Sequence, residues 1–265
     1  MASKKMTEQQ YRTHPGVNKS TLWELRKSPA HYKYALEHQT EKDTPALRFG
    51  RALHTAILQP EEFKQNYVVA PDIDRRTKAG RGEWERFLYE SAGKDVLSQD
   101  DFDTISGMYE AVYNDEDAAE LLNGCTTETP LFWTDEATRI RCKCRLDAHK
   151  DGIVVDLKSC ADAATGRFAR DAMKYGYDVQ AAHYLRGYKA KYGNNAEFWF
   201  LCVEKTPPYA VNVIKASDAF VDRGLWQLID LMDKLSDCRK RRKWPGYGKN
   251  ELVLPEWAMI PDDDE

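Results

Sequence analysis

The sequence predicts an α/β fold in which helices flank a mixed central sheet. Residues 139–159 read RIRCKCRLDAHKDGIVVDLKS, and four apolar side chains between positions 140 and 146 alternate with charged ones. A period of two is typical of a half-buried strand. Asp151-Gly152 is a strong hairpin-turn signal, and the nearly apolar residues 153–158 suit the centre of a sheet. Capped helical patterns on both sides of this hairpin supply the flanking layers.

Helices are expected to dominate the chain before the hairpin, in residues 17–123, whereas residues 1–16 are expected to be loosely ordered. Thr44-Pro45 marks a helix start. The residues that follow, ALRFGRALHTAILQ, repeat apolar positions at helical spacing and place His54 on or beside the packed face. The remaining elements expected here are a short strand at 67–69, a basic loop with two glycines at 71–82, and three helical segments within 83–123.

The sheet and its long helix are expected in residues 124–215, and a further long helix and an irregular segment in residues 216–265. Ser217 is a helix cap before an apolar stripe that continues to about Arg242. Since no linker or internal repeat interrupts the chain, we expect a single domain over residues 1–265. The other predicted elements are strands at 131–133, 198–203 and 210–214 and a helix at 177–192.

Composition argues against several classes of protein. The formal net charge of −4 argues against a protein that coats nucleic acid nonspecifically. No apolar run approaches the roughly 18 residues of a membrane helix, and the first ten residues lack the apolar core of a secretory signal. The six cysteines include no CxxC pair, which favours reduced structural thiols. The expected location is the cytoplasm, with no membrane association.

Polar side chains converge on the predicted hairpin. Asp156 and Lys158 are two residues apart on one strand, so both leave the same face at the sheet centre. Burying such charges is unfavourable unless partners neutralise them. Candidate partners are Asp147 at the end of the preceding strand, His54 on its helix, and Gln180 and Tyr184 on one face of the following helix.

Two carboxylates and an imidazole on adjacent elements form a mixed oxygen and nitrogen site, suited to Mg²⁺ or Mn²⁺ rather than to a closed zinc site. A metal there would polarise a phosphodiester and lower the pKa of its bound water. Lys158 would stabilise the negative charge that develops on phosphorus, or orient and help deprotonate the attacking water. The arrangement predicts phosphodiester hydrolysis. Taken singly, each of these residues also has a purely structural explanation. His54 would be a half-buried histidine, and Gln180 and Tyr184 would belong to a polar helix face.

The order of these motifs resembles the RecB-like branch of the PD-(D/E)XK nucleases. The branch is marked by a Gly-x-x-x-His helix, an Asp that closes a strand, an Asp-x-Lys strand and a Gln-x-x-x-Tyr helix. Here these read Gly50 to His54, Asp147, Asp156-Leu157-Lys158 and Gln180 to Tyr184. The resemblance implies a restriction-endonuclease-like core with helical N-terminal elaborations. Some relatives hold an iron–sulfur cluster, but this chain lacks their cysteine pattern, so no cluster is implied.

More narrowly, the chain resembles the RecE-type phage exonucleases (exonuclease VIII) from about residue 14, through LRFGRALHTAILQPEEF and APDIDRRTKAG, to LPEWA. The resemblance implies a Mg²⁺-dependent exonuclease that degrades linear duplex DNA 5′ to 3′ and leaves 3′ overhangs for recombination. It also implies a toroidal homotetramer, a RecT-like single-strand-annealing partner, and a phage or prophage origin in a bacterial host.

The resemblance also assigns roles to residues of this chain. His54, Asp147 and Asp156 would be metal ligands, with the backbone carbonyl of Leu157 as a fourth. Lys158 would be the catalytic lysine, and Gln180 and Tyr184 would position the nucleophile, the phosphate or Lys158. A further set of four basic side chains would grip the DNA backbone or a terminal 5′-phosphate: Arg75, Arg76, Lys78 and Arg81.

Two alternatives remain open at this stage. The first keeps the chemistry and changes the substrate, as in a structure-selective endonuclease or a single-strand exonuclease of the same branch. The second is a non-catalytic protein that binds DNA ends on a decayed nuclease fold. A nuclease fold that has lost its activity usually lacks a metal ligand or the catalytic lysine, whereas this chain retains the metal ligands and the lysine. The basic residues of the first hairpin strand, Arg141, Lys143 and Arg145, are expected to extend the site toward DNA.

Overall fold

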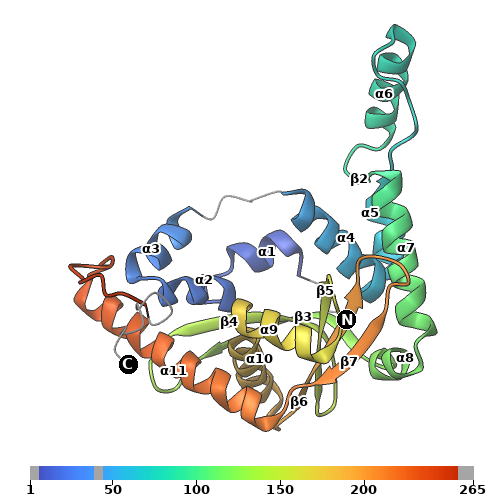
Figure 1. Ribbon diagram of the computed structural model, residues 1–265. Helices are drawn as coiled ribbons and strands as arrows, with labels where there is room; N and C mark the ends of the chain where they lie inside the picture. The colour runs from blue at the N-terminus through green and yellow to red at the C-terminus, as the bar shows by residue number, and fades with distance from the viewer. Residues whose placement is uncertain (1–5, 39–43, 256–265) are drawn as a thin grey trace, which may run out of the picture.

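A computed structural model describes residues 6–38 and 44–255 and contains a five-stranded mixed sheet (Figure 1). The strand order is β3-β4-β5-β6-β7, with β5 and β6 parallel and the other neighbours antiparallel. An α/β fold with this sheet is what the sequence predicts. The strands are β3 (Thr126–Thr134), β4 (Arg141–Lys150), β5 (Ile153–Cys160), β6 (Glu197–Glu204) and β7 (Val211–Lys215).

Helices α9 (Thr165–Tyr175) and α10 (Tyr177–Tyr192) form the crossover that makes β5 and β6 parallel. Apolar residues of α9 and α10 pack with Val154, Phe198 and Phe200 on one face of the sheet. The long helix α11 (Asp218–Arg241), capped by Ser217 as predicted, packs against α10. The sequence patterns did not reveal α9, but the predicted bounds of α10 are correct.

The opposite face of the sheet is covered by α4 (Pro45–Leu58), α7 (Gln99–Asn114) and α8 (Glu116–Leu122). Val155 and Leu157 of β5 point into this second apolar layer, so β5 is buried on both faces. The Thr44 hydroxyl accepts the Leu47 N–H, and Pro45 begins α4, as the sequence predicts. This helix brings His54 beside Asp147 of β4, an inner strand of the sheet.

The N-terminal segment is more regular than expected. Thr7 caps helix α1 (Glu8–Thr13) through a reciprocal capping box, where the sequence predicted loose order. Next come α2 (Lys19–Trp23), the 3₁₀ helix η1 (Glu24–Arg26) and α3 (Pro29–Glu37). The loose order expected of residues 1–5 and the irregular segment expected of residues 256–265 fall outside the described residues.

An arm projects from the body of the molecule and ends in helix α6 (Lys78–Glu90) (Figure 1). Its base is α5 (Pro60–Asn66) and a parallel pair of short strands, β1 (Tyr67–Val69) and β2 (Asp95–Leu97). The sequence predicted β1, but residues 78–82 are helical instead of part of a basic loop. The reason is that Thr77 caps the helix, and Gly80 lies so close to the Asp74 carbonyl that a side chain would not fit.

Within the described part of the chain, no helix is both long and apolar enough to cross a membrane.

Candidate active site

The sheet opens where the predicted site lies. Backbone pairing between β4 and β5 runs from Lys150 opposite Ile153 only as far as Ala148 opposite Val155. Beyond that point the side chain of Asp147 takes over, and its Oδ2 accepts the Leu157 N–H at 2.9 Å. The two strands therefore separate at the position that carries the carboxylates. A substrate or ion can approach the backbone there.

Asp156 and Lys158 form a buried ion pair on β5, through Asp156 Oδ2 and Lys158 Nζ. This contact lacks the alignment of a hydrogen bond. The other carboxylate oxygen accepts a hydrogen bond from Gln180 Nε2 at 2.5 Å, which fixes its orientation. Asp156 is 1 % exposed, and burial raises its pKa to about 6 although Lys158 opposes the rise.

Lys158 remains a cation in this environment. Burial lowers its pKa, but the carboxylates of Asp156 and Asp147 outweigh burial and hold the pKa above the ordinary value. The ammonium also lies 4.6 Å from the centroid of the Tyr177 ring, at the start of α10. Lys158 is therefore a fixed positive charge, suited to a phosphate oxygen.

Tyr184 lies one helical turn beyond Gln180 on α10, as its four-residue spacing predicts. Burial, followed by the nearby charges of Asp156 and Asp147, raises its pKa far above the ordinary value. The hydroxyl is therefore neutral and can donate a hydrogen bond. Its ring packs edge-on against Phe198 of β6.

His54 reaches the site from α4. Its Nδ1 lies 3.6 Å from Asp147 Oδ2, and the backbone of Leu157 is a second polar neighbour of the ring. Burial, and then the positive charge of Lys158, lowers the pKa of His54 to about 4, so the imidazole is neutral and able to ligate a metal. The sequence predicted that His54, Asp147 and Leu157 lie together, and the structure brings them together.

Glu128 of β3 completes a group that the sequence analysis missed. Ligand atoms of His54, Glu128 and Asp147 all lie within 4.8 Å of one another. A Mg²⁺ ion with bonds of about 2.1 Å holds its ligands roughly 3–4 Å apart, so a small closure of these side chains would surround one. Their mixed oxygen and nitrogen donors fit a hard divalent cation. Asp156 lies beside this group, and its two carboxylate oxygens contact Lys158 and Gln180.

Glu128 occupies a gap in the sheet. The β3–β4 ladder pairs Thr127 with Ala148 and Thr129 with Leu146, but it skips Glu128 and Asp147 between them. Glu128 has a φ of 52°, a conformation that non-glycine residues adopt infrequently and mostly where surrounding contacts impose it. Its carboxylate also forms an ion pair with Arg145 Nε at 2.6 Å.

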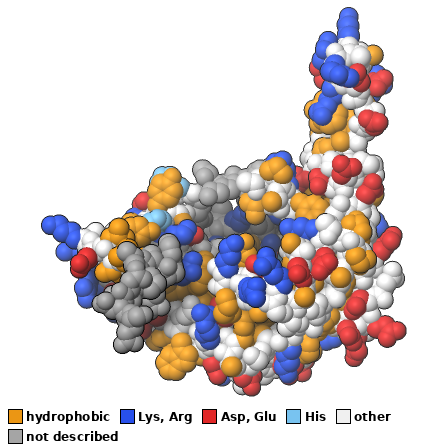
Figure 2. Space-filling view, in the orientation of Figure 1, with side chains coloured by type: hydrophobic (Ala, Val, Ile, Leu, Met, Phe, Trp, Pro, Cys, Tyr) orange, Lys and Arg blue, Asp and Glu red, His pale blue; other side chains and the backbone are white. Residues whose placement is uncertain are grey.

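A cleft of about 1150 Å³ adjoins the metal-binding group. Its walls include His54, Glu128 and Arg145 on one side and Lys94 and Asp95 at the base of the arm on the other. Figure 2 shows Lys and Arg side chains around the hollow in this face of the molecule. The cleft thus leads from the site toward the arm.

Two of the basic β4 residues that were expected to extend the site toward DNA, Lys143 and Arg145, have different surroundings. Lys143 is buried, and its ammonium donates to the carbonyls of Tyr11, Arg12 and His14 at 2.8–3.0 Å. The expectation that Lys143 extends the site toward DNA is therefore wrong: it secures the N-terminal segment to β4. Arg145 does line the cleft.

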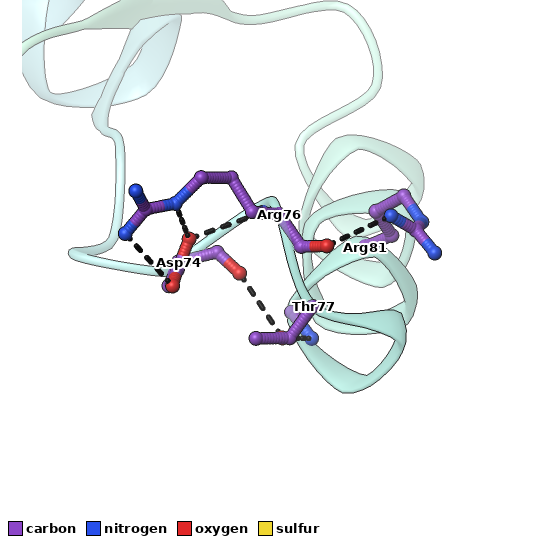
Figure 3. A network of polar contacts seen from close by, with 5 residues as sticks. Asp74, Arg76, Thr77 and Arg81 are labelled. Carbon is purple, nitrogen blue, oxygen red and sulfur yellow. Dashed lines mark hydrogen bonds and ion pairs between the residues drawn. The ribbon is translucent and has the colours of Figure 1, made fainter.

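Arg75, Arg76, Lys78 and Arg81 lie at the arm and not beside the metal-binding group (Figures 1 and 3). Arg76 pairs with Asp74, and Arg81 donates to the Arg76 carbonyl at 3.0 Å. The Arg75 guanidinium lies over the Trp84 ring at 4.4 Å. These contacts order the turn and present its cations to solvent.

Comparisons with known proteins agree with this architecture. Residues 18–254 match a family described as a PDDEXK-like domain of unknown function (DUF3799). A crystal structure of a candidate exonuclease from Eubacterium rectale has 13% identity and a TM-score of 0.64, and the alignment covers 96% of each chain. At this identity the likeness establishes a shared fold.

A second crystal structure, of a phage-related exonuclease from Haemophilus somnus 129PT, has 13% identity and a TM-score of 0.35. The alignment covers 88% of this chain and 98% of that one, but the similarity is too low to support an argument. No curated protein matches the sequence.

Proposed function

Because the chain belongs to the PDDEXK-like family DUF3799, we propose that it is a metal-dependent nuclease that hydrolyses phosphodiester bonds in DNA. The observation that carries the proposal is the buried Asp156–Lys158 pair beside the group formed by His54, Glu128 and Asp147. A fixed cation next to a cluster of hard ligands suits phosphoryl chemistry and has no evident structural purpose where β4 and β5 separate.

Hydrolysis adds a water oxygen to phosphorus and breaks one phosphorus–oxygen bond, and the departing oxygen ends as a hydroxyl. Lys158 would stabilise the negative charge that builds on the phosphate oxygens during this exchange. Gln180 holds the Asp156 carboxylate in one orientation, so that the ammonium keeps its place. The neutral Tyr184 hydroxyl would donate to a phosphate or water oxygen near them.

A divalent cation, Mg²⁺ or Mn²⁺, would be held by His54, Glu128 and Asp147, with Asp156 and the Leu157 carbonyl as further ligands. When bound, it would polarise the scissile phosphate and lower the pKa of the attacking water. The neutral imidazole and the ordered Asp147 carboxylate support this assignment, because both are in ligating form before any ion arrives.

Within nucleases, we propose an exodeoxyribonuclease that degrades linear duplex DNA 5′ to 3′ and leaves 3′ overhangs for single-strand annealing. Support comes from the motif resemblance and from a solved structure that shares this fold and is described as a candidate exonuclease. A homotetramer and an annealing protein partner, in a bacterial cytoplasm, belong to the same proposal. The arm cations would contact the duplex backbone ahead of the cleft and not a terminal phosphate, since they stand apart from the metal-binding group.

The decisive experiment compares three substrates in Mg²⁺: linear 5′-phosphorylated duplex, covalently closed circular duplex, and single-stranded DNA. Separate labels on the 5′ and 3′ ends report polarity, and sizing in solution reports the oligomer. The proposal predicts loss of the linear duplex with early release of the 5′ label. Rapid loss of the closed circle would point to an endonuclease, and intact DNA in every lane would refute a nuclease.

A further inference from the structure

Lys19, the first residue of α2, brings a second ammonium group close to Lys158. Its Nζ donates to the Tyr175 carbonyl at 2.5 Å and lies 5.9 Å from the centroid of the Tyr177 ring. The Lys158 ammonium lies 4.6 Å from the centroid of the same ring. Two lysines from distant parts of the chain therefore share one tyrosine.

The charge of Lys19 has no counter-charge in contact with it. Among the described residues, no carboxylate forms an ion pair with Lys19, whereas Lys158 has Asp156. Burial, followed by the like charge of Lys158, lowers the pKa of Lys19 to about 8, and Asp156 and Asp178 only partly oppose this. Positive charge is thus concentrated beside the site, where an anion from outside the chain would neutralise it.

Three helices hold Lys19 in place. Asn18 caps α2 by accepting the Thr21 N–H at 2.8 Å. Trp23, whose ring centroid lies 5.0 Å from the Lys19 ammonium, packs against the turn between α9 and α10. In that turn Gly176 has a φ of +66°, and any Cβ there would lie 2.6 Å from the Trp23 ring. The glycine therefore permits the contact that positions the lysine.

Lys19 is also separate from the cleft. The residues that line the cleft include His54 but not Lys19, Tyr177 or Lys158. A nucleic-acid strand that passes from the cleft to Lys158 would also come near Lys19, because both ammonium groups lie over the Tyr177 ring. Phosphates recur along such a strand, and an ammonium binds one as a point charge without demanding a fixed geometry.

We propose that Lys19 binds a phosphate group of the DNA substrate next to the one being hydrolysed. The inference rests on the proposed nuclease function and assigns the substrate contact on the α2 side of the site. Two sources would supply this phosphate: the internal backbone, or a terminal phosphate at the end of the strand.

The test uses the full chain and compares Lys19→Gln with Lys27→Gln, a matched control on the adjacent segment whose exposed ammonium pairs only with Glu24. Binding of duplex DNA is measured in Ca²⁺ over a range of salt concentrations, and turnover is measured in Mg²⁺. Each duplex is prepared with a 5′-phosphate and with a 5′-hydroxyl. Thermal unfolding of each variant reports folding, and Lys19→Met replaces Lys19→Gln if the latter does not fold.

Lys19→Gln should weaken DNA binding roughly tenfold and lower the salt slope by about one, through loss of one phosphate contact. It should raise KM more than it lowers kcat, and Lys19→Arg should restore binding. Loss with both kinds of end identifies an internal phosphate, and loss only with the 5′-phosphate identifies a terminal one.

An unchanged salt slope in a folded Lys19→Gln protein, or an equal effect of Lys27→Gln, would overturn the inference. If the wild type cleaves DNA while Lys19→Gln behaves identically, only this inference fails. If the wild type neither binds nor cleaves DNA, the proposed function itself is refuted.

Discussion

The carboxylate of Asp147 accepts the backbone N–H of Leu157 at 2.9 Å, in the place where a strand partner would otherwise accept it. The side chain thereby satisfies a buried donor that the opening of β4 from β5 would leave unpaired. The same bond orients Asp147 toward His54, 3.6 Å away. The hydrogen bond between Asp147 and Leu157 therefore both permits β4 to separate from β5 and holds Asp147 in position for the site.

Lys158→Ala should abolish cleavage while DNA binding remains close to that of the wild type. Loss of a preorganised charge at a reacting phosphate lowers kcat by roughly 100- to 1000-fold. Single-turnover cleavage in Mg²⁺ and binding in Ca²⁺ separate the two effects. Lys191→Ala, an exposed lysine at the end of α10, serves as the control. Cleavage at the wild-type rate by Lys158→Ala would refute the role assigned to this lysine.

Glu128→Gln should weaken metal binding by at least about tenfold, because it removes one charged oxygen from the ligand group formed with His54 and Asp147. Calorimetric titration of Mn²⁺ into the DNA-free protein measures this directly. The activity of the variant should recover at high Mg²⁺. Glu136→Gln, at an exposed turn, should bind Mn²⁺ as the wild type does. Equal affinity in both variants would exclude Glu128 as a ligand.

The double variant Lys78→Gln/Arg81→Gln should weaken binding of long duplexes and lower the salt slope by up to about two, since each cation contacts one phosphate. Cleavage of a duplex too short to reach the arm should be unaffected. The control is Glu83→Gln/Glu85→Gln on the same helix, which removes acidic groups and should not weaken binding. If long and short duplexes lose affinity equally, the arm does not act as a remote contact.

Gly224→Ala should destabilise the fold by several kcal/mol and reduce activity. A Cβ at this position of α11 would lie 2.0 Å from the Asp178 carbonyl, so α10 and α11 would have to separate. Because α10 carries Gln180 and Tyr184, the site would shift with it. Gly166→Ala in α9, where a Cβ meets nothing within 4 Å, should be neutral or stabilising. Urea unfolding compares the two, and similar stabilities would contradict the packing argument.

His183 should make stability depend on pH. Burial lowers its pKa from 6.5 to about 4, while its hydrogen bond to the Lys143 carbonyl and the charge of Asp135 oppose this and the Arg186 charge reinforces it. Between pH 6.5 and about 4, His183 is therefore protonated to a greater extent in the unfolded chain than in the folded protein. The contribution of His183 to stability is therefore fully present above about pH 6.5 and falls by about 3 kcal/mol as the pH falls toward 4.

His183→Gln should remove the contribution of His183 and leave that of His54, whose pKa is lowered in the same way, so the slope should become shallower. The same substitution at the exposed His38 should leave the slope unchanged. Urea unfolding at intervals between pH 4 and 7 gives the slopes. Parallel slopes for wild type and His183→Gln would show that another group is responsible.

Local signals were sufficient to predict much of the fold. The caps Thr44 and Ser217, the Asp151-Gly152 turn and the alternation before Asp147 report contacts a few residues apart, and the structure contains each corresponding element. His54 and Gln180 were predictable as partners of Asp156 and Lys158, because helical spacing placed each of them on a definite face of its helix.

The remainder depends on contacts between distant residues. Helix α6 contains two glycines and many charges, which hide its start at the Thr77 cap, and Gly80 is required there because a side chain would meet the Asp74 carbonyl. Glu128 joins the site through an unusual φ in a strand that the apolar pattern locates only from Leu131. Lys19 lies in a helix of five residues and approaches Lys158 only because α2 packs beside α10.

The three carbonyls that accept hydrogen bonds from Lys143 belong to Tyr11, Arg12 and His14, which precede it in the chain by 132, 131 and 129 residues. The segment they anchor supplies Thr7, Tyr11 and Arg12 to the wall of the cleft. On a ribosome, this segment emerges before β4 and acquires its anchor only after β4 has been synthesised and released. Closing so long a loop is slow compared with local helix formation. The wall of the cleft that this segment forms is therefore completed late. A nascent chain would contain α4 and the arm before this wall is in place.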